Sequence, residues 1–347
     1  MKRTIPLLVC AAMTTLASAQ TRWAVVVHGG AGVIDRKSMR PETEKQYRVQ
    51  MEAALQTAAQ VLERGGNSLD AVESAIKLME DDPLFNAGRG AVFTSEGKNE
   101  LDSAIMEGGS LRAGAVAGVT RTRHPISLAR AVMEKSPHVL LIGEGADRFA
   151  AEAGLEQVPP SFFFTERRWQ GLVRELKKNG KPIPPRPAGV PPEPAKPLSE
   201  IEPPAAHRFG TVGVVALDRR GNLAAGTSTG GTQAKRPGRV GDTPIIGAGT
   251  YAANQSCAVS GTGTGEFFIR LTVAREICAL VQYKSMPLQA AADEVIQKRL
   301  TAMHGEGGII AIDTKGDTVW SFNSSGMYRA RMKEGGKPEI AIYKDEP

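Results

Sequence analysis

Two kinds of apolar pattern alternate along the chain, and together they predict a protein that mixes strands and helices. Short apolar or alternating runs are typical of strands, and they occupy residues 22–27, 100–106, 113–120, 138–142, 212–217, 223–229, 256–260, 308–312, 318–322 and 340–343. Apolar residues at helical spacing occupy 43–64, 68–79, 126–135, 145–153, 166–178, 267–283 and 287–303. Because both kinds of block occur in each half of the chain, we expect helices layered outside packed sheets.

Local signals mark some of these bounds. Gly65 and Gly66 predict the end of the first helix, and Asn67 predicts the cap of the second. The Gly-rich run at 28–32 predicts a turn in which backbones approach closely. That run lacks the Lys-Ser/Thr pair of a phosphate-binding loop.

The apolar pattern is interrupted by a proline-rich segment at about 180–209. Such a segment cannot pack a core and behaves as a semi-rigid or disordered tether. Two interpretations stay open: an ordinary linker, or a tail that separates once the chain is cut at its end.

The segment ends at Gly210, and Thr211 then opens the apolar run at 212–217. Cleavage between Gly210 and Thr211 would leave a threonine with a free α-amine at the end of a strand. A hydroxyl nucleophile needs an adjacent base, and an α-amine with a pKa of about 7.7–8.0 can serve at neutral pH. One residue would then supply both groups. Taken alone, however, Gly-Thr is more often a plain loop residue entering a strand.

Other polar residues cluster at predicted strand ends. Antiparallel pairing of 212–217 with 223–229 brings Thr229 beside Thr211. Thr262 and Gly263 lie at a strand-to-helix turn, where free N–H groups suit an oxyanion. The alternatives are an ordinary strand hydroxyl for Thr229 and a dinucleotide-binding loop at 261–265.

Arg239 and Asp242 lie three residues apart in a Gly-rich turn. A guanidinium can bind a carboxylate and an aspartate can bind an ammonium group, so the pair suits both ends of an amino acid. A surface salt bridge between the two is the commoner alternative.

The first residues have the pattern of a secretory signal peptide. A basic start, an apolar run and the small residues at 17–19 predict cleavage before Gln20 and export to the periplasm or beyond. The apolar run is too short to span a bilayer, so no membrane anchor is expected. Export permits a bridge between Cys257 and Cys278; we favour two buried thiols.

Composition narrows the function classes. The chain has 347 residues, 41% hydrophobic and 23% charged, which suits one large or two modest globular domains. A net charge of +6 is spread without a basic stripe, which argues against a nucleic-acid partner. The five histidines include no pair at His-x-x-x-His spacing, so a catalytic zinc is not expected.

The motifs taken in order are far more specific than any one of them. Gly-Thr at 210–211, Thr-Ser-Thr-Gly-Gly at 227–231, Gly-Arg-Val-Gly-Asp at 238–242 and Gly-Thr-Gly-x-Gly-Glu at 261–266 follow one another, after Asn-Ala-Gly-x-Gly at 86–90. With this set the chain, from 28 to 328, resembles the plant-type asparaginase/isoaspartyl peptidase family of N-terminal-nucleophile hydrolases.

The resemblance implies an α+β fold, a four-layer αββα sandwich. It implies an α subunit at 20–210 and a β subunit at 211–347, which pair as a dimer of αβ units. Thr211 would be the nucleophile, with Thr229 supporting it and Thr262 and Gly263 forming the oxyanion hole. The substrate would be bound by Arg239, Asp242, Gly265 and Asn86.

No catalytic cofactor is implied, but a structural sodium is. Its ligands would be the backbone carbonyls of Met79, Glu80, Asp82, Phe85, Ala87 and Arg89. Arg89 stands where the family pattern has a smaller or apolar residue. For the acidic side chains at 80–82 we favour a solvated helix end.

The implied reaction is hydrolysis of the β-amide of L-asparagine and of β-aspartyl dipeptides. Two alternatives stay open: a glycosylasparaginase of the same fold, and an exported amino-acid-binding protein that uses the Arg239/Asp242 pair without chemistry.

Overall fold

The computed structural model describes residues 22–32, 34–37, 39–194 and 210–346. The predicted signal peptide at 1–19 lies outside the described residues, and so does the end of the proline-rich segment, 195–209. Predictions about these two segments therefore stay predictions.

The larger sheet has eight strands in the order β12-β11-β1-β5-β6-β2-β3-β4. Its neighbours pair antiparallel except β3 and β4, which are parallel. The strands are β1 (Ala24–Gly32), β2 (Leu101–Glu107), β3 (Ala113–Val119), β4 (Leu140–Ile142), β5 (Val212–Leu217), β6 (Leu223–Thr229), β11 (Gly326–Lys333) and β12 (Glu339–Tyr343).

The smaller sheet has four antiparallel strands in the order β10-β9-β8-β7. They are β7 (Thr250–Ala252), β8 (Cys257–Gly263), β9 (Gly307–Asp313) and β10 (Thr318–Phe322).

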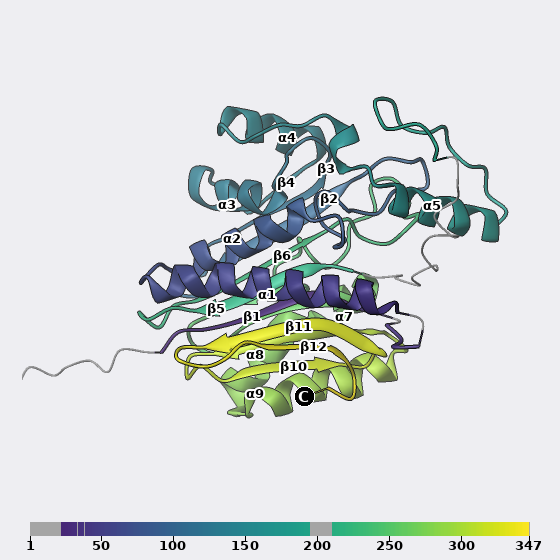
Figure 1. Cartoon of the computed structure of the whole chain (residues 1–347). Coiled ribbons are helices and arrows are strands. Elements are labelled where there is room, and N and C mark those ends of the chain that lie inside the picture. The colour runs from purple at the N-terminus through teal and green to yellow at the C-terminus, as the bar shows by residue number, and fades with distance from the viewer. Residues whose placement is uncertain (1–21, 33, 38, 195–209, 347) are drawn as a thin grey trace, which may run out of the picture.

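Helices lie outside the two sheets, with α1 and α2 along the large sheet and α8 and α9 at the opposite side of the molecule (Figure 1). The helical elements are α1 (Pro41–Glu63), α2 (Ser68–Asp81), α3 (Pro125–Lys135), α4 (Gly143–Glu152), the 3-10 helix η1 (Pro160–Phe163), α5 (Glu166–Lys178), α7 (Gly265–Leu271), α8 (Val273–Lys284), α9 (Leu288–Asp293) and the π-helical η2 (Glu294–Leu300). In the described part of the chain, no helix combines the length and the apolarity needed to cross a membrane.

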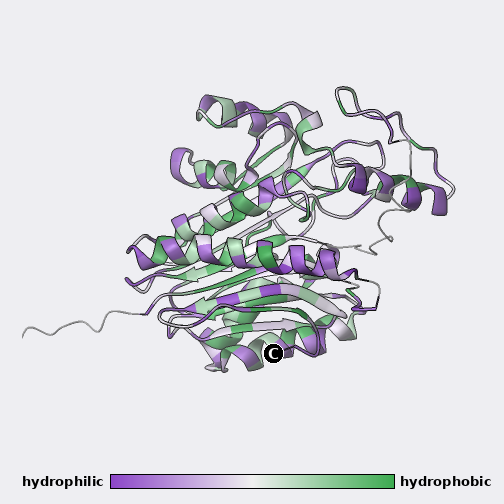
Figure 2. Ribbon diagram, in the orientation of Figure 1, coloured by the Kyte–Doolittle hydropathy of each residue, from purple (hydrophilic) through white to green (hydrophobic). Residues whose placement is uncertain are grey.

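Strand alternation explains the layering. Along β1, Val25 and Val27 pack in the cluster that holds α1 and α2 against the sheet. Ala24 and Val26 point the other way, into a cluster shared with Ile310 of the small sheet. The outer face of the small sheet packs on α8 and α9. Figure 2 shows the same division, with apolar positions along the strands and polar positions on the outward faces of α1 and α5. The predicted four-layer αββα sandwich is confirmed.

Most predicted elements are present, and several differ. The run at 28–32 is not a turn, because β1 continues through it with a bulge between His28 and Gly30. The helix expected at 267–283 is two helices, divided at Thr272, which has a left-handed backbone with φ 46°. The helix expected at 287–303 passes from α9 into the π-helical η2. Strand β11 was not predicted.

The expectation of two buried thiols is wrong, because Cys257 and Cys278 form a disulfide. Cys257 begins β8 and Cys278 lies in α8, which packs on the outer face of that strand. This packing brings the two Cα atoms to 5.3 Å, within the usual range for a bridge.

Candidate active site

The β5–β6 hairpin brings Thr211 and Thr229 together. Val212 pairs with Ser228 in the antiparallel register, so the residues just beyond this pair meet at the hairpin's open end. The hydroxyl of Thr211 donates to that of Thr229 at 3.1 Å, and the amide of Gly231 donates to the same Thr229 oxygen at 3.0 Å. Both threonines are buried. The hydroxyl at 211 is thus oriented before any substrate arrives.

The carbonyl of Gly210 is held by two donors. Asn86 Nδ2 donates to it at 2.6 Å and the Thr229 hydroxyl at 3.2 Å. Asn86 is itself fixed, because Val92 N donates to its Oδ1 at 2.9 Å and its Nδ2 also reaches Gly231 O at 2.7 Å. Fixed donors on a carbonyl oxygen favour the negative charge that develops there during nucleophilic attack.

Gly30 packs directly against this peptide. It has a φ of 111°, and a Cβ there would lie 2.8 Å from Gly210 Cα and 3.1 Å from Thr211 N. Only glycine fits both the backbone angle and the space. The close backbone approach predicted for the glycine run is therefore confirmed, although the run is a bulged strand.

A pocket on one side of Gly210 contains the predicted amino-acid site; we call it the Arg239 pocket. Its lining includes Thr211, Thr229, Arg239, Asp242 and Gly263. A Cβ on Gly265 would lie 2.8 Å from Asp242 Oδ1 and 3.0 Å from an Arg239 guanidinium nitrogen. The predicted residues Arg239, Asp242 and Gly265 therefore do converge beside Thr211.

Arg239 and Asp242 do not pair with each other. The Arg239 guanidinium makes two hydrogen bonds, both 3.0 Å, to the carboxylate of Glu266. Asp242 is buried, and burial raises the pKa of its carboxyl to about 6. Its Oδ2 has no hydrogen-bond partner among the described residues. A buried acceptor of this kind suits an ammonium group.

Thr262 and Gly263 are the last two residues of β8. Gly263 lines the Arg239 pocket, while the Thr262 hydroxyl accepts a hydrogen bond of 3.3 Å from Ala31 N of β1. Helix α7 begins two residues later, at Gly265. The pair thus lies at the predicted strand-to-helix junction, and its role as an oxyanion site stays a prediction.

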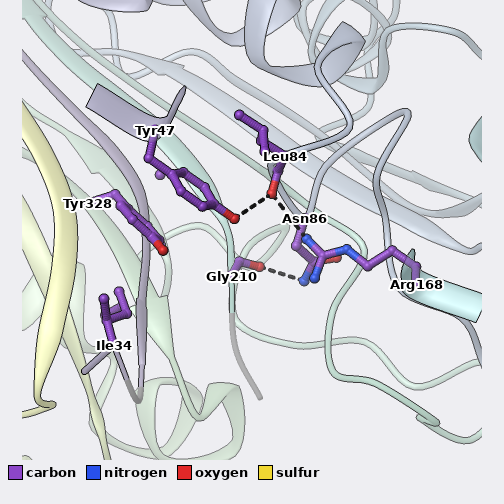
Figure 3. A pocket seen from close by; sticks show the side chains of 10 residues that line it. Ile34, Tyr47, Leu84, Asn86, Arg168, Gly210 and Tyr328 are labelled. Carbon is purple, nitrogen blue, oxygen red and sulfur yellow. Dashed lines mark hydrogen bonds between the residues drawn. The ribbon is translucent and has the colours of Figure 1, made fainter. Parts of the chain in front are cut away.

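A second pocket lies on the other side of Gly210; we call it the Arg168 pocket. In the uncut chain it is a narrow pocket with a volume of about 10 Å³, and it is lined by Gly30, Tyr47, Asn86, Arg168, Gly210 and Tyr328, among others. Figure 3 shows Tyr47 and Tyr328 on one side of Gly210, with Asn86 and Arg168 on the other. Gly210 belongs to both pockets and separates them.

A family model described as Asparaginase matches residues 21–342. The chain belongs to this asparaginase family. Among its relatives is the isoaspartyl peptidase of Escherichia coli (strain K12), 47% identical over 322 residues, which are 93% of this chain and 96% of the relative. The plant-type L-asparaginase of Pyrococcus furiosus is 44% identical and covers 92% of this chain and 99% of its own length. The isoaspartyl peptidase/L-asparaginase of Xenopus laevis is 38% identical, at 93% and 96% coverage.

Within this asparaginase-family chain, sequence reasoning missed a buried polar chain between the two sheets. His28 Nε2 lies 2.9 Å from Ser260 Oγ, which lies 2.7 Å from Thr227 Oγ1, and Thr250 donates to Thr227 at 2.7 Å. Burial lowers the pKa of His28 to about 3, against a smaller opposing effect of the Thr211 backbone, so the ring is neutral. A Cβ on Gly213 would lie 2.2 Å from His28 Nε2. This series of hydrogen-bonded side chains therefore supports the strand β5, which follows directly on Thr211.

Two buried charges behind Thr229 were also missed. Asp102 pairs with Thr229 in the β2–β6 register, and burial raises the pKa of its carboxyl. Burial lowers the pKa of Lys235, whose ammonium donates to Glu100 O at 2.9 Å. The Lys235 and Asp102 charges oppose these burial effects on each other's pKa. Lone acids and lysines carry no sequence signal that would single these two out.

The end of α2 and the loop that follows it correct one expectation. Glu80 is not solvated: its side chain is fully buried, accepts from Ser228 Oγ at 2.6 Å and Ile126 N at 3.0 Å, and lies 3.3 Å from His124 Nδ1. Burial raises the pKa of this carboxyl. Because Ser228 adjoins Thr229, Glu80 ties the loop to the strand that carries Thr229.

The backbone from the end of α2 into this loop curls on itself. The carbonyls of Met79, Glu80 and Asp82 each accept one amide, at 3.3, 2.6 and 3.3 Å. A carbonyl oxygen has two lone pairs, so each keeps one for a cation. The Arg89 side chain is exposed and does not fill the loop. The set of six carbonyl ligands stays a prediction.

Proposed function

We propose that this chain is an autoproteolytically activated amidohydrolase that hydrolyses the β-amide of L-asparagine and of β-aspartyl dipeptides and releases L-aspartate. The observation that carries the proposal is the Gly210–Thr211 peptide. The Gly210 carbonyl accepts hydrogen bonds from Asn86 and Thr229, and the Thr211 hydroxyl donates to Thr229. The Arg239 pocket adjoins this peptide. The names of the relatives support the same substrate class.

The first reaction is cleavage of the chain itself. The Thr211 oxygen attacks the Gly210 carbonyl carbon, the C–N bond breaks, and the nitrogen takes a proton to become the α-amine of Thr211. Water then hydrolyses the Gly210–Thr211 ester. Asn86 Nδ2, at 2.6 Å from the carbonyl oxygen, stabilises the negative charge that forms on it.

In turnover the new amine takes the proton of the Thr211 hydroxyl, and the oxygen attacks the β-carbonyl carbon of the substrate. Ammonia or an amino acid leaves with a proton, and water hydrolyses the β-aspartyl ester. Thr262 and Gly263 are the proposed oxyanion site, where loss of one donor typically costs about 2.7–4 kcal/mol.

The Arg239 pocket would hold the amino-acid end of the substrate. The Asp242 carboxylate, buried and short of a partner on Oδ2, would bind the α-ammonium group. The Arg239 guanidinium would bind the α-carboxylate through two hydrogen bonds, the geometry in which it now holds Glu266.

Thr211→Ala tests the proposal. We expect a single band on a denaturing gel and no release of aspartate, whereas Thr211→Ser keeps a hydroxyl and should still be cut and retain measurable turnover. Two bands from Thr211→Ala, or turnover by it, would show that another residue is the nucleophile.

A substrate panel separates the proposal from a glycosylasparaginase. Wild-type protein should release aspartate from asparagine and from a β-aspartyl dipeptide faster than from a glycosylasparagine. The reverse order would assign the glycosylated substrate instead.

We also propose a structural sodium at the carbonyls of the loop after α2, supported by its curled backbone. Replacing sodium by tetramethylammonium at constant ionic strength should lower the Tm; an unchanged Tm would argue against the ion.

A dimer of αβ units is proposed on the strength of the family. The exposed apolar side chains of Leu140 and Ile142 on the edge strand β4, and of Val139 just before it, are consistent with a dimer. Light scattering should give twice the mass of the cleaved chain; a mass of one copy would contradict the dimer.

Export is proposed from the signal-peptide pattern of residues 1–19, and fractionation of the native host checks it.

A further inference from the structure

Arg168 is a buried cation that no carboxylate of the described residues neutralises. Its Nε donates to Gly90 O at 2.6 Å, and its terminal nitrogen lies 3.4 Å from Leu84 O. Among the described residues, no acidic side chain lies within ion-pair distance of its guanidinium. Burial lowers the pKa of Arg168 to about 9, so it is still protonated at neutral pH. A buried charge without a counter-ion is costly unless it serves a ligand.

The walls around Arg168 suit an amino acid. The rings of Tyr47 and Tyr328 stack on each other with their centroids 4.0 Å apart. They lie across the pocket from the guanidinium and form an aromatic wall (Figure 3). The Tyr47 hydroxyl is fixed by a 3.1 Å bond to Leu84 O. The pocket thus combines one cation with one aromatic wall.

The position of this pocket relative to the scissile bond is defined by Gly210. The Arg239 pocket and the Arg168 pocket meet at this residue, one on each side. In the proposed function the amino-acid end of the substrate binds Arg239 and Asp242, and its β-carbonyl lies at Thr211. The leaving amine then lies at the position that Gly210 occupies in the uncut chain. Cleavage and departure of Gly210 would join the two pockets.

We propose that the Arg168 pocket is the leaving-group subsite, in which Arg168 binds the α-carboxylate of the amino acid released from a β-aspartyl dipeptide. This inference rests on the proposed function and deepens it. In the step concerned, the amide C–N bond breaks as the Thr211 ester forms, and the departing nitrogen takes the proton that the Thr211 amine removed from the hydroxyl. Arg168 takes no part in this transfer and acts on binding alone.

Arg168 is expected to affect only the binding of substrates whose leaving group carries a carboxylate. Ammonia, the leaving group of asparagine, has no carboxylate for Arg168 to bind. A dipeptide whose C-terminus is amidated has the same size and no charge there. Three probes therefore isolate the contact: β-aspartyl-leucine, its C-terminal amide, and asparagine.

The first test needs no variant. The cleaved wild-type enzyme should show a KM for β-aspartyl-leucine roughly 10- to 100-fold below that for the amidated dipeptide, the usual effect of a hydrogen bond between charged groups. Equal KM values would overturn the inference. Absence of turnover on all three probes would instead contradict the proposed function.

The second test is Arg168→Met. We expect the KM for β-aspartyl-leucine to rise roughly 10- to 100-fold, with the KM for asparagine and for the amidated dipeptide changing less than about threefold and kcat changing little. Arg168→Lys should recover part of the loss. An equal loss on all three probes would show that Arg168 only holds the loop at 83–90.

Arg167→Met is the matched control. Arg167 precedes Arg168 in α5 and donates to Pro83 O at 3.0 Å and Leu84 O at 2.7 Å, on the same loop. Arg167 does not itself line the pocket, but its guanidinium also donates to the Tyr47 hydroxyl at 3.4 Å, so the variant also controls for loss of support to that wall. Arg167→Met should leave the ratio of the KM values for β-aspartyl-leucine and its amide unchanged. A KM ratio that shifts as far as in Arg168→Met would overturn the assignment of the carboxylate to Arg168.

Discussion

Two arginines flank Gly210, and their surroundings differ. Arg239 already holds a carboxylate, that of Glu266, whose side chain is 58% exposed. Arg168 is buried, and among the residues that the structure describes its guanidinium is bound only to backbone carbonyls. A ligand carboxylate at Arg239 exchanges with Glu266, so its net gain is small. A ligand carboxylate at Arg168 neutralises a guanidinium that has no counter-ion among the described residues, so the gain in binding free energy is larger. The first site suits a substrate that must enter and leave, and the second suits discrimination between leaving groups.

The largest effect on this comparison is expected from Asp242→Asn, which removes the charge that would bind the α-ammonium group. Losing one partner of a buried charge pair typically costs about 2–5 kcal/mol, so kcat/KM for asparagine should fall at least about 30-fold. Steady-state kinetics on asparagine and on β-aspartyl-leucine check this. Because both substrates carry the same amino-acid end, both should fall alike; a loss on one alone would contradict the placement of Asp242.

Asp242 also predicts a pH dependence. Burial raises the pKa of its carboxyl to about 6, above an unfolded value of about 3.9. The folded state therefore binds this proton more tightly, and wild-type stability should fall relative to Asp242→Asn as pH rises from about 4 to 6. At pH 7 the variant should be more stable by on the order of 2–3 kcal/mol. Urea unfolding at pH 4 and pH 7 measures the difference; a variant less stable at pH 7 would contradict the account.

Gly30→Ala tests the packing of Gly30 against Gly210, the residue that both pockets share. The new methyl would lie 2.8 Å from Gly210 Cα, so the Gly210–Thr211 peptide must shift relative to its hydrogen-bond donor Asn86, and we expect cleavage to slow at least about tenfold. The fraction of cut chain against time measures it. Gly143→Ala is the control, because Gly143 also has a positive φ, 55°, but meets nothing within 4 Å. Equal slowing in both variants would attribute the effect to backbone strain alone.

The smallest effect is expected from Glu266→Gln, which frees Arg239 from its exposed partner. Exposed ion pairs contribute about 0–1 kcal/mol, so the KM for asparagine should fall by no more than about fivefold, and less at high salt. A KM that rises would show that Glu266 helps to bind the substrate rather than competing for Arg239.

Local pattern was enough to predict most of the sandwich. Asn67 caps α2 as expected, accepting from Asp70 N at 2.8 Å, and the β5–β6 hairpin places Thr229 beside Thr211. Strand β11 escaped because its arginines suggest a surface segment. Arg329, on that strand, is buried between the rings of Trp320 and Phe322 and donates to backbone carbonyls. Only the tertiary structure makes that position buried.

The same limit applies to the site. The residues of the Arg239 pocket lie in a few Gly-rich motifs, so spacing could indicate them. Arg168 lies in an ordinary charged helix, and its role depends on packing against the loop at 83–90, far away in the sequence. The Cys257–Cys278 bridge depends in the same way on α8 packing across β8.

The most direct test of the account is N-terminal sequencing and intact-mass measurement of the active wild-type protein. We predict two pieces, one of which begins Thr-Val-Gly-Val at residue 211. A fully active preparation that consists of one unbroken polypeptide would contradict the claim that breaking the Gly210–Thr211 peptide creates the reactive amine.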